Sequence, residues 1–369
     1  MSYFRTAIAT TSGYIPGEQP KPGTKIIKLN TNENPYPPSP QAIDVLRSLD
    51  GEWLRRYPDP RARDFCNAVS DVLNVPSDWI IVGNGSDDLL NLLVRSCAEG
   101  AGRTVVYPTP TYVLYRTLAA IQPATVVEIP YPDTFQLPLE RLMAANGAIT
   151  FLASPNSPSG HEVPLEEVRQ LAQGVSGLVV VDEAYVDFGT QSALSLVQEL
   201  DNVVVLRTLS KGYSLAGLRL GFGIGHPTVI NELFKVKDSY NIDAIAIALG
   251  TAAMQDQAHK NACAEKVKRS RSGLSTSLEQ LGFTVFPSHG NFVLATPPHS
   301  DPSHNAPSHK NAERLYLALK DRGILVRYFN QPGLDDKLRI TVGTDDQNAH
   351  FIDVLAQLLE NETTLTTVR

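Results

Sequence analysis

The stretch LRTLSKGYSLAGLRLG, residues 206–221, begins at the end of the apolar run Val203–Leu206. A short run of consecutive apolar residues predicts a buried strand, and the glycines that follow it predict turns. The strand should therefore deliver Thr208, Ser210 and Lys211 onto a glycine-rich turn. Turns held in place by a rigid scaffold are where reactive side chains commonly lie.

Lys211 is a candidate nucleophile. Desolvation and a neighbouring cation, here Arg219, free the amine of a lysine to form a Schiff base. A single lysine is more often a solvated surface residue, so the rest of the chain must decide between the two interpretations. The run Leu178–Val181 predicts a second buried strand, and Asp182 places a carboxylate at its carboxyl end, where open α/β sheets bind ligands.

Pyridoxal phosphate requires a lysine for a covalent link, a carboxylate that keeps its ring nitrogen protonated, and an anion site for its phosphate. The chain contains Asn156, Asp182, Tyr185, the pair Ser210-Lys211 and Arg219. Their order and approximate spacing resemble the motifs of fold-type-I aminotransferases. Within that group the chain is most similar, over nearly its whole length, to the histidinol-phosphate aminotransferases. The resemblance implies pyridoxal 5'-phosphate as cofactor and Lys211, Asp182 and Tyr185 as catalytic residues.

The implied reaction is a transamination of histidinol phosphate with 2-oxoglutarate, which yields imidazole-acetol phosphate and L-glutamate in histidine biosynthesis. Aromatic amino-acid aminotransferases and threonine-phosphate decarboxylases of the same subgroup remain alternatives. A non-catalytic ligand-binding protein on the same scaffold is the alternative from another class. A nicotinamide dehydrogenase is disfavoured. In the stretch that starts at Gly221, the G-x-G-x-x-G fingerprint needs a glycine at position 226, and that residue is His226.

Alternating strands and helices are predicted over much of the chain. Further strands are expected at residues 104–107, 125–129 and 149–153, with helical stretches between several of them. This alternation indicates an α/β fold with a mainly parallel, mixed sheet covered by helices. The resemblance implies the fold-type-I transferase arrangement, in which this large domain is joined by a smaller α+β domain.

Composition changes suggest where the domains divide. Residues 13–40 are rich in proline, glycine and asparagine, which is typical of an extended arm. After residue 241 the pattern becomes a helical run to residue 281, followed by short strands at 283–286, 291–296, 324–329 and 338–342. We expect an N-terminal arm at 1–30 that packs with the small domain and the substrate pocket, a large cofactor-binding domain at 31–241 and a small C-terminal domain at 242–369.

A phosphate site is expected at the start of one helix. Residues 79–94 fit a strand, a glycine turn and an amphipathic helix that begins near Gly85, Ser86 and Asp87. Free N–H groups and the helix dipole suit a phosphate there, but Ser86 is equally well explained as an N-cap. The resemblance implies both roles, and it adds Thr208, Ser210 and Arg219 to the cofactor site.

Tyr57 lies in the sequence Arg56-Tyr-Pro-Asp59, which by composition is an ordinary turn. The resemblance implies instead that Tyr57 reaches the cofactor phosphate bound by another subunit. A homodimer with shared active sites is then expected.

Two turns at strand ends are candidates to hold the cofactor ring. Tyr112 alone would be explained by packing, whereas the resemblance implies that it stacks on the pyridine ring. Asn156 alone would be explained as a turn former, whereas the resemblance implies that it and Tyr185 bind the ring hydroxyl. Ser157 and Ser159 depart from the Asn and Thr that are usual in this turn of the family.

The substrate side is expected around Arg327 and Arg339. An arginine on a strand can direct two donors at a carboxylate or phosphate, or it can point to solvent from an edge strand. The resemblance implies that both arginines, with Tyr14 from the arm and Asn32, bind a phosphate-bearing substrate.

Composition excludes several partners. The 369 residues carry a formal charge of −7, which gives no footprint for nucleic acid or an acidic membrane surface. The three cysteines are too few and too scattered for a disulfide framework or metal knuckle, which suits a cytoplasmic protein. No signal peptide or membrane-spanning segment is predicted. His299, His304 and His309 fall in a Pro/Ser-rich stretch without regular ligand spacing, so no metal is expected.

Overall fold

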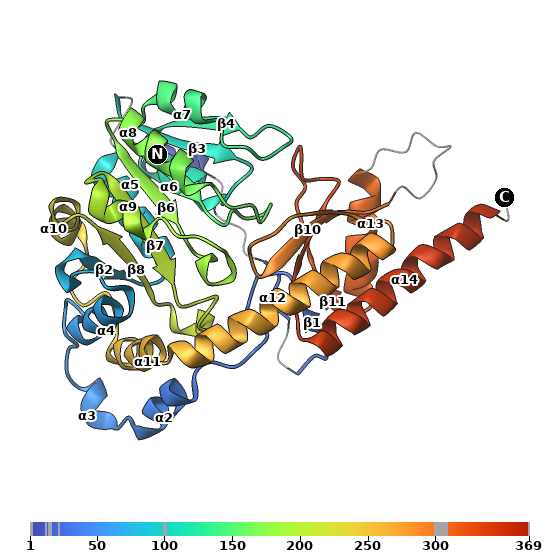
Figure 1. The fold of residues 1–369 in the computed structure, drawn as a ribbon, viewed down its shortest axis with the longest axis horizontal. Helices are drawn as coiled ribbons and strands as arrows, with labels where there is room; N and C mark the ends of the chain where they lie inside the picture. Colours follow the sequence, from blue (N-terminus) through green and yellow to red (C-terminus); the bar gives the residue numbers. More distant parts are fainter. Residues whose placement is uncertain are drawn as a thin grey trace.

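A seven-stranded mixed sheet forms the centre of the larger part of the molecule (Figure 1). The computed structural model describes residues 3–11, 13, 17–20, 23–98, 102–298 and 309–367. The strands of this sheet are β2 (Ile80–Gly83), β3 (Thr104–Thr109), β4 (Thr125–Pro130), β5 (Ile149–Ala153), β6 (Leu178–Asp182), β7 (Val203–Thr208) and β8 (Gly221–Gly225). They lie in the order β2-β8-β7-β6-β5-β3-β4. Strands β3 to β7 run parallel and β8 is antiparallel to its two neighbours, which confirms the predicted α/β class.

Helices cover both faces of this sheet, because its strands are apolar on both sides. Along β7, Val203 and Val205 join one core cluster, whereas Val204 and Leu206 join the other, as the alternation of side chains along a strand requires. The first face packs against α4 (Arg63–Leu73), α7 (Leu139–Ala145), α8 (Leu165–Gly174), α9 (Leu194–Glu199) and α11 (Ala244–Gln255). The second packs against α5 (Ser86–Cys97), α6 (Leu114–Ile121) and α10 (Pro227–Val236).

Shorter helices connect these elements. They are α1 (Thr6–Thr10), which packs against α6, α2 (Pro40–Ser48), which packs against α11, and α3 (Gly51–Leu54). Single turns of 3-10 helix occur at Ser77–Trp79, Val186–Phe188 and Ala216–Leu218. The α2 helix begins at Pro40, because Ser39 caps the N–H of Gln41 and a proline occupies the first helical position.

A four-stranded antiparallel sheet with its own core forms the second part of the molecule. Its strands, in spatial order, are β12 (Arg327–Tyr328), β13 (Leu338–Thr341), β10 (Phe292–Thr296) and β9 (Thr284–Phe286). The helices of this part are α12 (Gln257–Gln280), α13 (His309–Asp321) and α14 (Asp345–Thr367). Strand β1 (Ile27–Lys28) of the N-terminal arm pairs in parallel with β11 (Ile324–Leu325), so the arm is tied to this part. In the described ranges, no helix combines enough length and apolar character to cross a bilayer.

The helical run expected from residue 242 to residue 281 is two helices in the structure. Asp256 separates them with a backbone that leaves the helical region, and its carboxylate accepts from the N–H of His259 at 3.2 Å to cap α12. Helix α11 packs against α2 and α4, and α12 runs from there toward the second sheet (Figure 1). The chain thus leaves one hydrophobic core and joins the other where α11 meets α12. The division of the chain into domains at residues 30 and 241 stays a prediction.

The carboxyl ends of the parallel strands meet at one edge of the large sheet. The register pairs Ala153 of β5 with Asp182 of β6, and Asp182 with Leu206 of β7. The turn after β5, the carboxylate of Asp182 and the loop that carries Lys211 therefore lie side by side. In open α/β sheets this edge is where ligands bind.

Candidate active site

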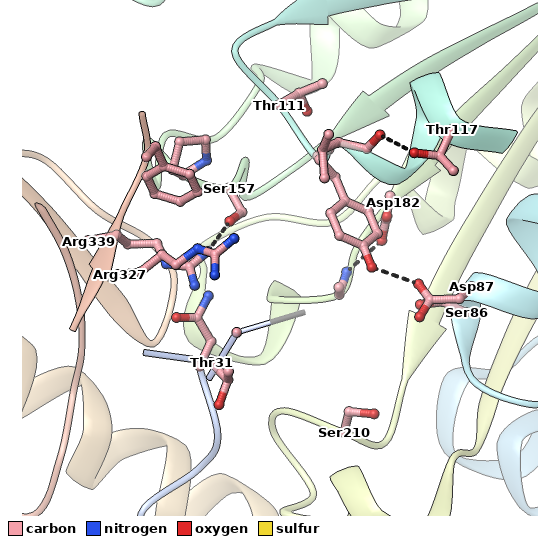
Figure 2. Close-up of a pocket in the computed structure, with 18 of the residues that line it drawn as sticks. Thr31, Ser86, Asp87, Thr111, Thr117, Ser157, Asp182, Ser210, Arg327 and Arg339 are labelled. Atoms are coloured by element: carbon pink, nitrogen blue, oxygen red, sulfur yellow. Dashed lines mark hydrogen bonds between the residues drawn. The ribbon is translucent and has the colours of Figure 1, made fainter. Parts of the chain in front are cut away.

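A cavity of about 980 Å³ opens at this edge, between the two parts of the molecule (Figure 2). Its lining includes most of the residues that the sequence suggested, namely Asn32, Ser86, Asp87, Tyr112, Asp182, Tyr185, Thr208, Ser210, Lys211, Arg219, Arg327 and Arg339. These residues come from loops that are far apart in the sequence. The loops meet because the order of the strands in the sheet, and not their order in the chain, decides which strand ends are neighbours. The cavity is large enough for a cofactor together with a small substrate.

Lys211 lies three residues beyond the end of β7 and contributes its amine to the cavity. Its Nζ donates a hydrogen bond to the carbonyl of Thr31 at 3.1 Å and lies 5.7 Å from the centre of the Tyr185 ring. The loop is fixed from the arm side as well, because the amide of Asn34 donates to the carbonyl of Lys211 at 3.0 Å. The lysine is therefore held in one place and is not a freely solvated surface residue.

Asp182 ends β6 and is 5 % exposed. The hydroxyl of Tyr115 donates to its Oδ2 at 2.9 Å, and the N–H of Ala184 donates to its Oδ1 at 3.2 Å. Burial raises the pKa of the Asp182 carboxyl to about 6, and the hydrogen bond from Tyr115 opposes this rise. Asp182 thus presents an acceptor that is ionised near neutral pH to the cavity, which suits a partner that carries a positive N–H.

Sequence reasoning did not single out Tyr115. Tyr115 is the second residue of α6 and stands three residues after Tyr112, which lies just before the helix. In the structure the two rings pack edge to face, with their centroids 5.7 Å apart.

An anion site is formed where α5 begins. The side chains of Thr208, Ser210 and Arg219 are linked, since Thr208 Oγ1 donates to Ser210 Oγ at 2.9 Å and Arg219 Nη1 donates to the same oxygen at 3.3 Å. Asp87 accepts from the Tyr112 hydroxyl at 3.1 Å and from Arg219 Nη2 at 3.5 Å. Hydroxyls, a guanidinium and the free N–H groups of a helix start are the donors that a phosphate needs.

Two glycines keep this site open. Gly85 has φ +77, and a Cβ on it would lie 2.5 Å from Arg219 Nη2. A Cβ on Gly221 would lie 2.4 Å from the backbone nitrogen of Ser86. Any side chain at either position would displace the groups that can contact an anion, so the donor set and the space both fit the phosphate of pyridoxal phosphate.

Asn156 lies beneath the cavity and does not line it. It is fully buried, its Nδ2 donates to the carbonyl of Pro110 at 3.1 Å and to Ser159 Oγ at 2.7 Å, and its Oδ1 accepts from Thr111 at 2.7 Å. These bonds hold the turn after β5 against the turn after β3. Its contact with a cofactor ring hydroxyl stays a prediction.

Asn32 joins the two parts of the molecule beside the cavity. It adopts a left-handed backbone with φ 55, its Nδ2 donates to the Tyr185 hydroxyl at 2.9 Å, and its Oδ1 accepts from Thr341 at 3.0 Å. Tyr185, which follows β6 in the chain, is therefore positioned by a residue that is itself tied to β13.

Arg327 and Arg339 are direct partners across β12 and β13. Figure 2 shows their side chains together, across the cavity from Asp182. Both guanidinium groups lie near the ring of Phe329, at 5.4 and 5.5 Å from its centre. Arg339 also donates to Ser157 Oγ and to the carbonyl of Asn30, each at 2.9 Å. Two positive groups thus form one end of the cavity.

The model of the aminotransferase class I and II family matches residues 24–355. The chain belongs to the class I and II aminotransferases. The predicted resemblance, the fold type and the prediction of an aminotransferase are confirmed by this match and by the relatives of the chain. The histidinol-phosphate aminotransferase 1 of Trichormus variabilis is 59% identical over 97% of this chain and 99% of its own length.

Other members of the family agree. The histidinol-phosphate aminotransferase 1 of a Nostoc species is 57% identical over 98% of this chain and 99% of its own length. Among solved structures, the histidinol-phosphate aminotransferase of Sinorhizobium meliloti in complex with pyridoxal-5'-phosphate is 28% identical, has a TM-score of 0.85 and matches 98% of both chains.

Some predicted residues of this aminotransferase lie away from the cavity. Tyr57 is 82% exposed and stacks on Tyr240 with the ring centroids 4.6 Å apart. Tyr14 falls outside the described residues, as do His299 and His304, and His309 is the first residue of α13. Within the part of the chain that the structure describes, no group of three or more His, Cys, Asp or Glu side chains is arranged to hold a metal ion.

Proposed function

We propose that this aminotransferase exchanges an amino group between histidinol phosphate and 2-oxoglutarate, with pyridoxal 5'-phosphate as cofactor, and so serves histidine biosynthesis. The main support for this substrate is the pair Arg327 and Arg339, which places two positive charges at the end of the cavity opposite Asp182. A phosphate carries a larger charge and more acceptor oxygens than a carboxylate, so two arginines suit it better. The relatives at 57–59% identity support the same substrate.

The cofactor supplies, when bound, an aromatic ring that accepts the charge left on the substrate carbon. Ser86, Ser210 and Arg219 would hold its phosphate, and Asp182 would bond to its ring nitrogen. Tyr112 would lie against the ring face, while Tyr185 and Asn156 would bond to the ring hydroxyl.

The chain's own groups perform the proton transfers. Lys211 Nζ, held by the carbonyl of Thr31, removes the proton from the substrate carbon as a general base and returns it as a general acid. Asp182 stays negative above a pKa of about 6 and stabilises a positive charge in front of it. Arg327 and Arg339 fix the far end of the substrate, which keeps the reacting carbon near Lys211.

A substrate panel tests the proposed reaction directly. Histidinol phosphate, phenylalanine, tyrosine and threonine phosphate are each mixed with the holoenzyme, and the spectral change of the first half-reaction is followed. We expect histidinol phosphate to give the highest kcat/KM. A higher value for phenylalanine or tyrosine would assign the chain to the aromatic amino-acid aminotransferases, and release of carbon dioxide from threonine phosphate would assign it to the decarboxylases.

Replacing Arg339 by glutamine should raise the KM for histidinol phosphate by about 10- to 100-fold, because hydrogen bonds to a charged group contribute roughly 1.5–3 kcal/mol each. The KM of Arg339→Lys should fall between those of the wild type and Arg339→Gln, since lysine keeps the charge but loses the forked geometry. The measurement is steady-state kinetics, with Arg322→Gln as the matched control, because Arg322 is an exposed arginine in the same part of the molecule. An unchanged KM in Arg339→Gln would remove this residue from the substrate site.

A homodimer with shared active sites is part of the proposal. Tyr57 does not line the cavity of its own chain, and its ring lies exposed on Tyr240, near the exposed Trp53 and Leu54 in sequence. An exposed aromatic of this kind suits a protein interface. A cytoplasmic location is likewise proposed, supported by the free state of Cys66, Cys97 and Cys263.

Mixing two inactive variants tests the shared sites. Tyr57→Ala and Lys211→Ala should each lose activity, but co-refolded 1:1 they should recover about a quarter of the wild-type value, because hybrid dimers contain one site with both residues intact. The measurement is activity after mixing, with each variant refolded alone as the control. No recovery in hybrids shown to form by mass spectrometry would place Tyr57 outside the partner's site.

A further inference from the structure

Tyr115 is the buried group that contacts Asp182 from the neighbouring helix, and nothing in the proposed mechanism uses it. Its hydroxyl donates to Asp182 Oδ2 at 2.9 Å, and its side chain has no exposed surface. We propose that Tyr115 is a positioning residue of this aminotransferase, which holds the Asp182 carboxylate in its ionised form and aims it at the cofactor ring nitrogen. This inference rests on the proposed cofactor site.

Packing fixes the direction of this hydrogen bond. The Tyr115 ring stacks on Phe151 of β5 with the centroids 4.8 Å apart and 11° between the ring planes. It also meets Tyr112 edge to face at 5.7 Å. A phenol held between a strand and a second aromatic ring has little freedom to move its oxygen, so the packing directs the hydroxyl at Oδ2 of Asp182. The second oxygen, Oδ1, is fixed by the N–H of Ala184.

The charges around Asp182 explain why such a donor is needed. Asp87 from α5 and the adjacent Glu183 are both negative, and together with burial they favour the protonated form of the Asp182 carboxyl. Asp87 is paired with Arg219, and Glu183 is paired with Arg207, at 3.5 and 2.9 Å. These pairings weaken the repulsion but do not contact Asp182. Among the described residues, Tyr115 is the side chain that donates directly to the carboxylate, and donation favours the ionised form.

A positioning role for Tyr115 and a role in aromatic packing alone predict different effects of pH on the Tyr115 variant. If the hydroxyl keeps Asp182 ionised, its removal raises the pKa of this carboxyl, and the loss of function is greatest at low pH. Ionisation is restored once the pH exceeds the raised pKa, so function returns at high pH. A residue that only packed would change function by the same factor at every pH.

The test is Tyr115→Phe, which keeps the ring and removes only the oxygen. The acid-side midpoint of kcat should move up by about one pH unit, because a hydrogen bond to a charged group is equivalent to roughly one to two pKa units. The Kd for pyridoxal phosphate, measured by absorbance titration of the apoprotein, should rise about tenfold near pH 6 and stay near the wild-type value at about pH 9.

Tyr107→Phe is the matched control. Tyr107 is equally buried in the same aromatic cluster, and its hydroxyl donates to a different carboxylate, Glu128, at 2.8 Å. This variant should leave both pH profiles in place. Two results would overturn the inference about Tyr115 and leave the proposed cofactor site intact. One is a Tyr115→Phe profile that is scaled down equally at every pH, and the other is a pH shift in Tyr107→Phe as large as that in Tyr115→Phe. A wild-type protein that binds no pyridoxal phosphate would overturn the proposed cofactor site with it.

Discussion

Lys211→Ala should lose about four orders of magnitude in turnover, because the variant lacks the general acid and base that moves the substrate proton. Among the described residues that line the cavity, Lys211 is the one lysine, and its amine is already placed by the carbonyl of Thr31. Turnover of histidinol phosphate, measured in the presence of excess cofactor, checks the expected loss.

Two further measurements separate chemistry from folding. Borohydride treatment followed by peptide mass spectrometry should find the cofactor attached at Lys211 in the wild type and nowhere in the variant. A small primary amine in the buffer should restore part of the turnover, because it can enter the cavity that the missing side chain leaves. Lys235→Ala is the matched control, since Lys235 is exposed on α10 and pairs with Glu232. If Lys211→Ala retained more than about a tenth of the wild-type turnover, another group would be the proton carrier.

Much of this site could be predicted because it lies at strand ends. The runs Leu178–Val181 and Val203–Leu206 are apolar throughout, and the run that ends at Ala153 is apolar except for Thr150. Such runs predict strands that are buried on both faces. Parallel strands joined by helices place their carboxyl ends at one edge, so the sequence predicts that Asp182 and Lys211 meet there. The register that pairs Asp182 with Leu206 shows the strands side by side.

The limits of the predicted elements have local causes. The sequence predicts that strand β3 ends at Tyr107. The next residue, Pro108, has no N–H to donate to a neighbouring strand. The strand continues to Thr109, because it pairs with β5 only through Val105 and Val106 and has β4 alone as its partner at Pro108. A proline is tolerated where one side of a strand is free of a partner.

Contacts between distant segments were beyond the reach of sequence patterns. Arg339 meets Ser157, and Asn32 meets both Tyr185 and Thr341, across separations of more than 150 residues. Periodicity shows which face of an element is apolar, but it does not show which polar side chain on another element will lie opposite. For the same reason the bond from Tyr115 to Asp182 was missed, although both elements were expected.

Asp182→Asn should lower turnover by about 10³-fold, the effect expected when one preorganised charge is lost beside a reacting system. The amide keeps the shape of the side chain and can still accept from Tyr115, but it cannot stabilise a positive charge in front of it. In the wild type, activity should fall as the pH drops through about 6, the pKa of the buried carboxyl. The residual activity of the variant should lack this acid limb, which a pH profile of kcat measures.

The same substitution should make the protein more stable above pH 6. Because the pKa of Asp182 is raised from 3.8 to about 6, the folded state binds a proton more readily than the unfolded state between these values. Stability therefore declines as the pH rises through this window, and above it the buried negative charge costs roughly 3 kcal/mol. Asparagine carries no such charge, so its free energy of unfolding should exceed that of the wild type near pH 8 and approach it near pH 4. The measurement is urea unfolding of the two apoproteins at both pH values. Equal stability would contradict the prediction, because it would show that the folded state already offsets the cost of burying the Asp182 carboxylate.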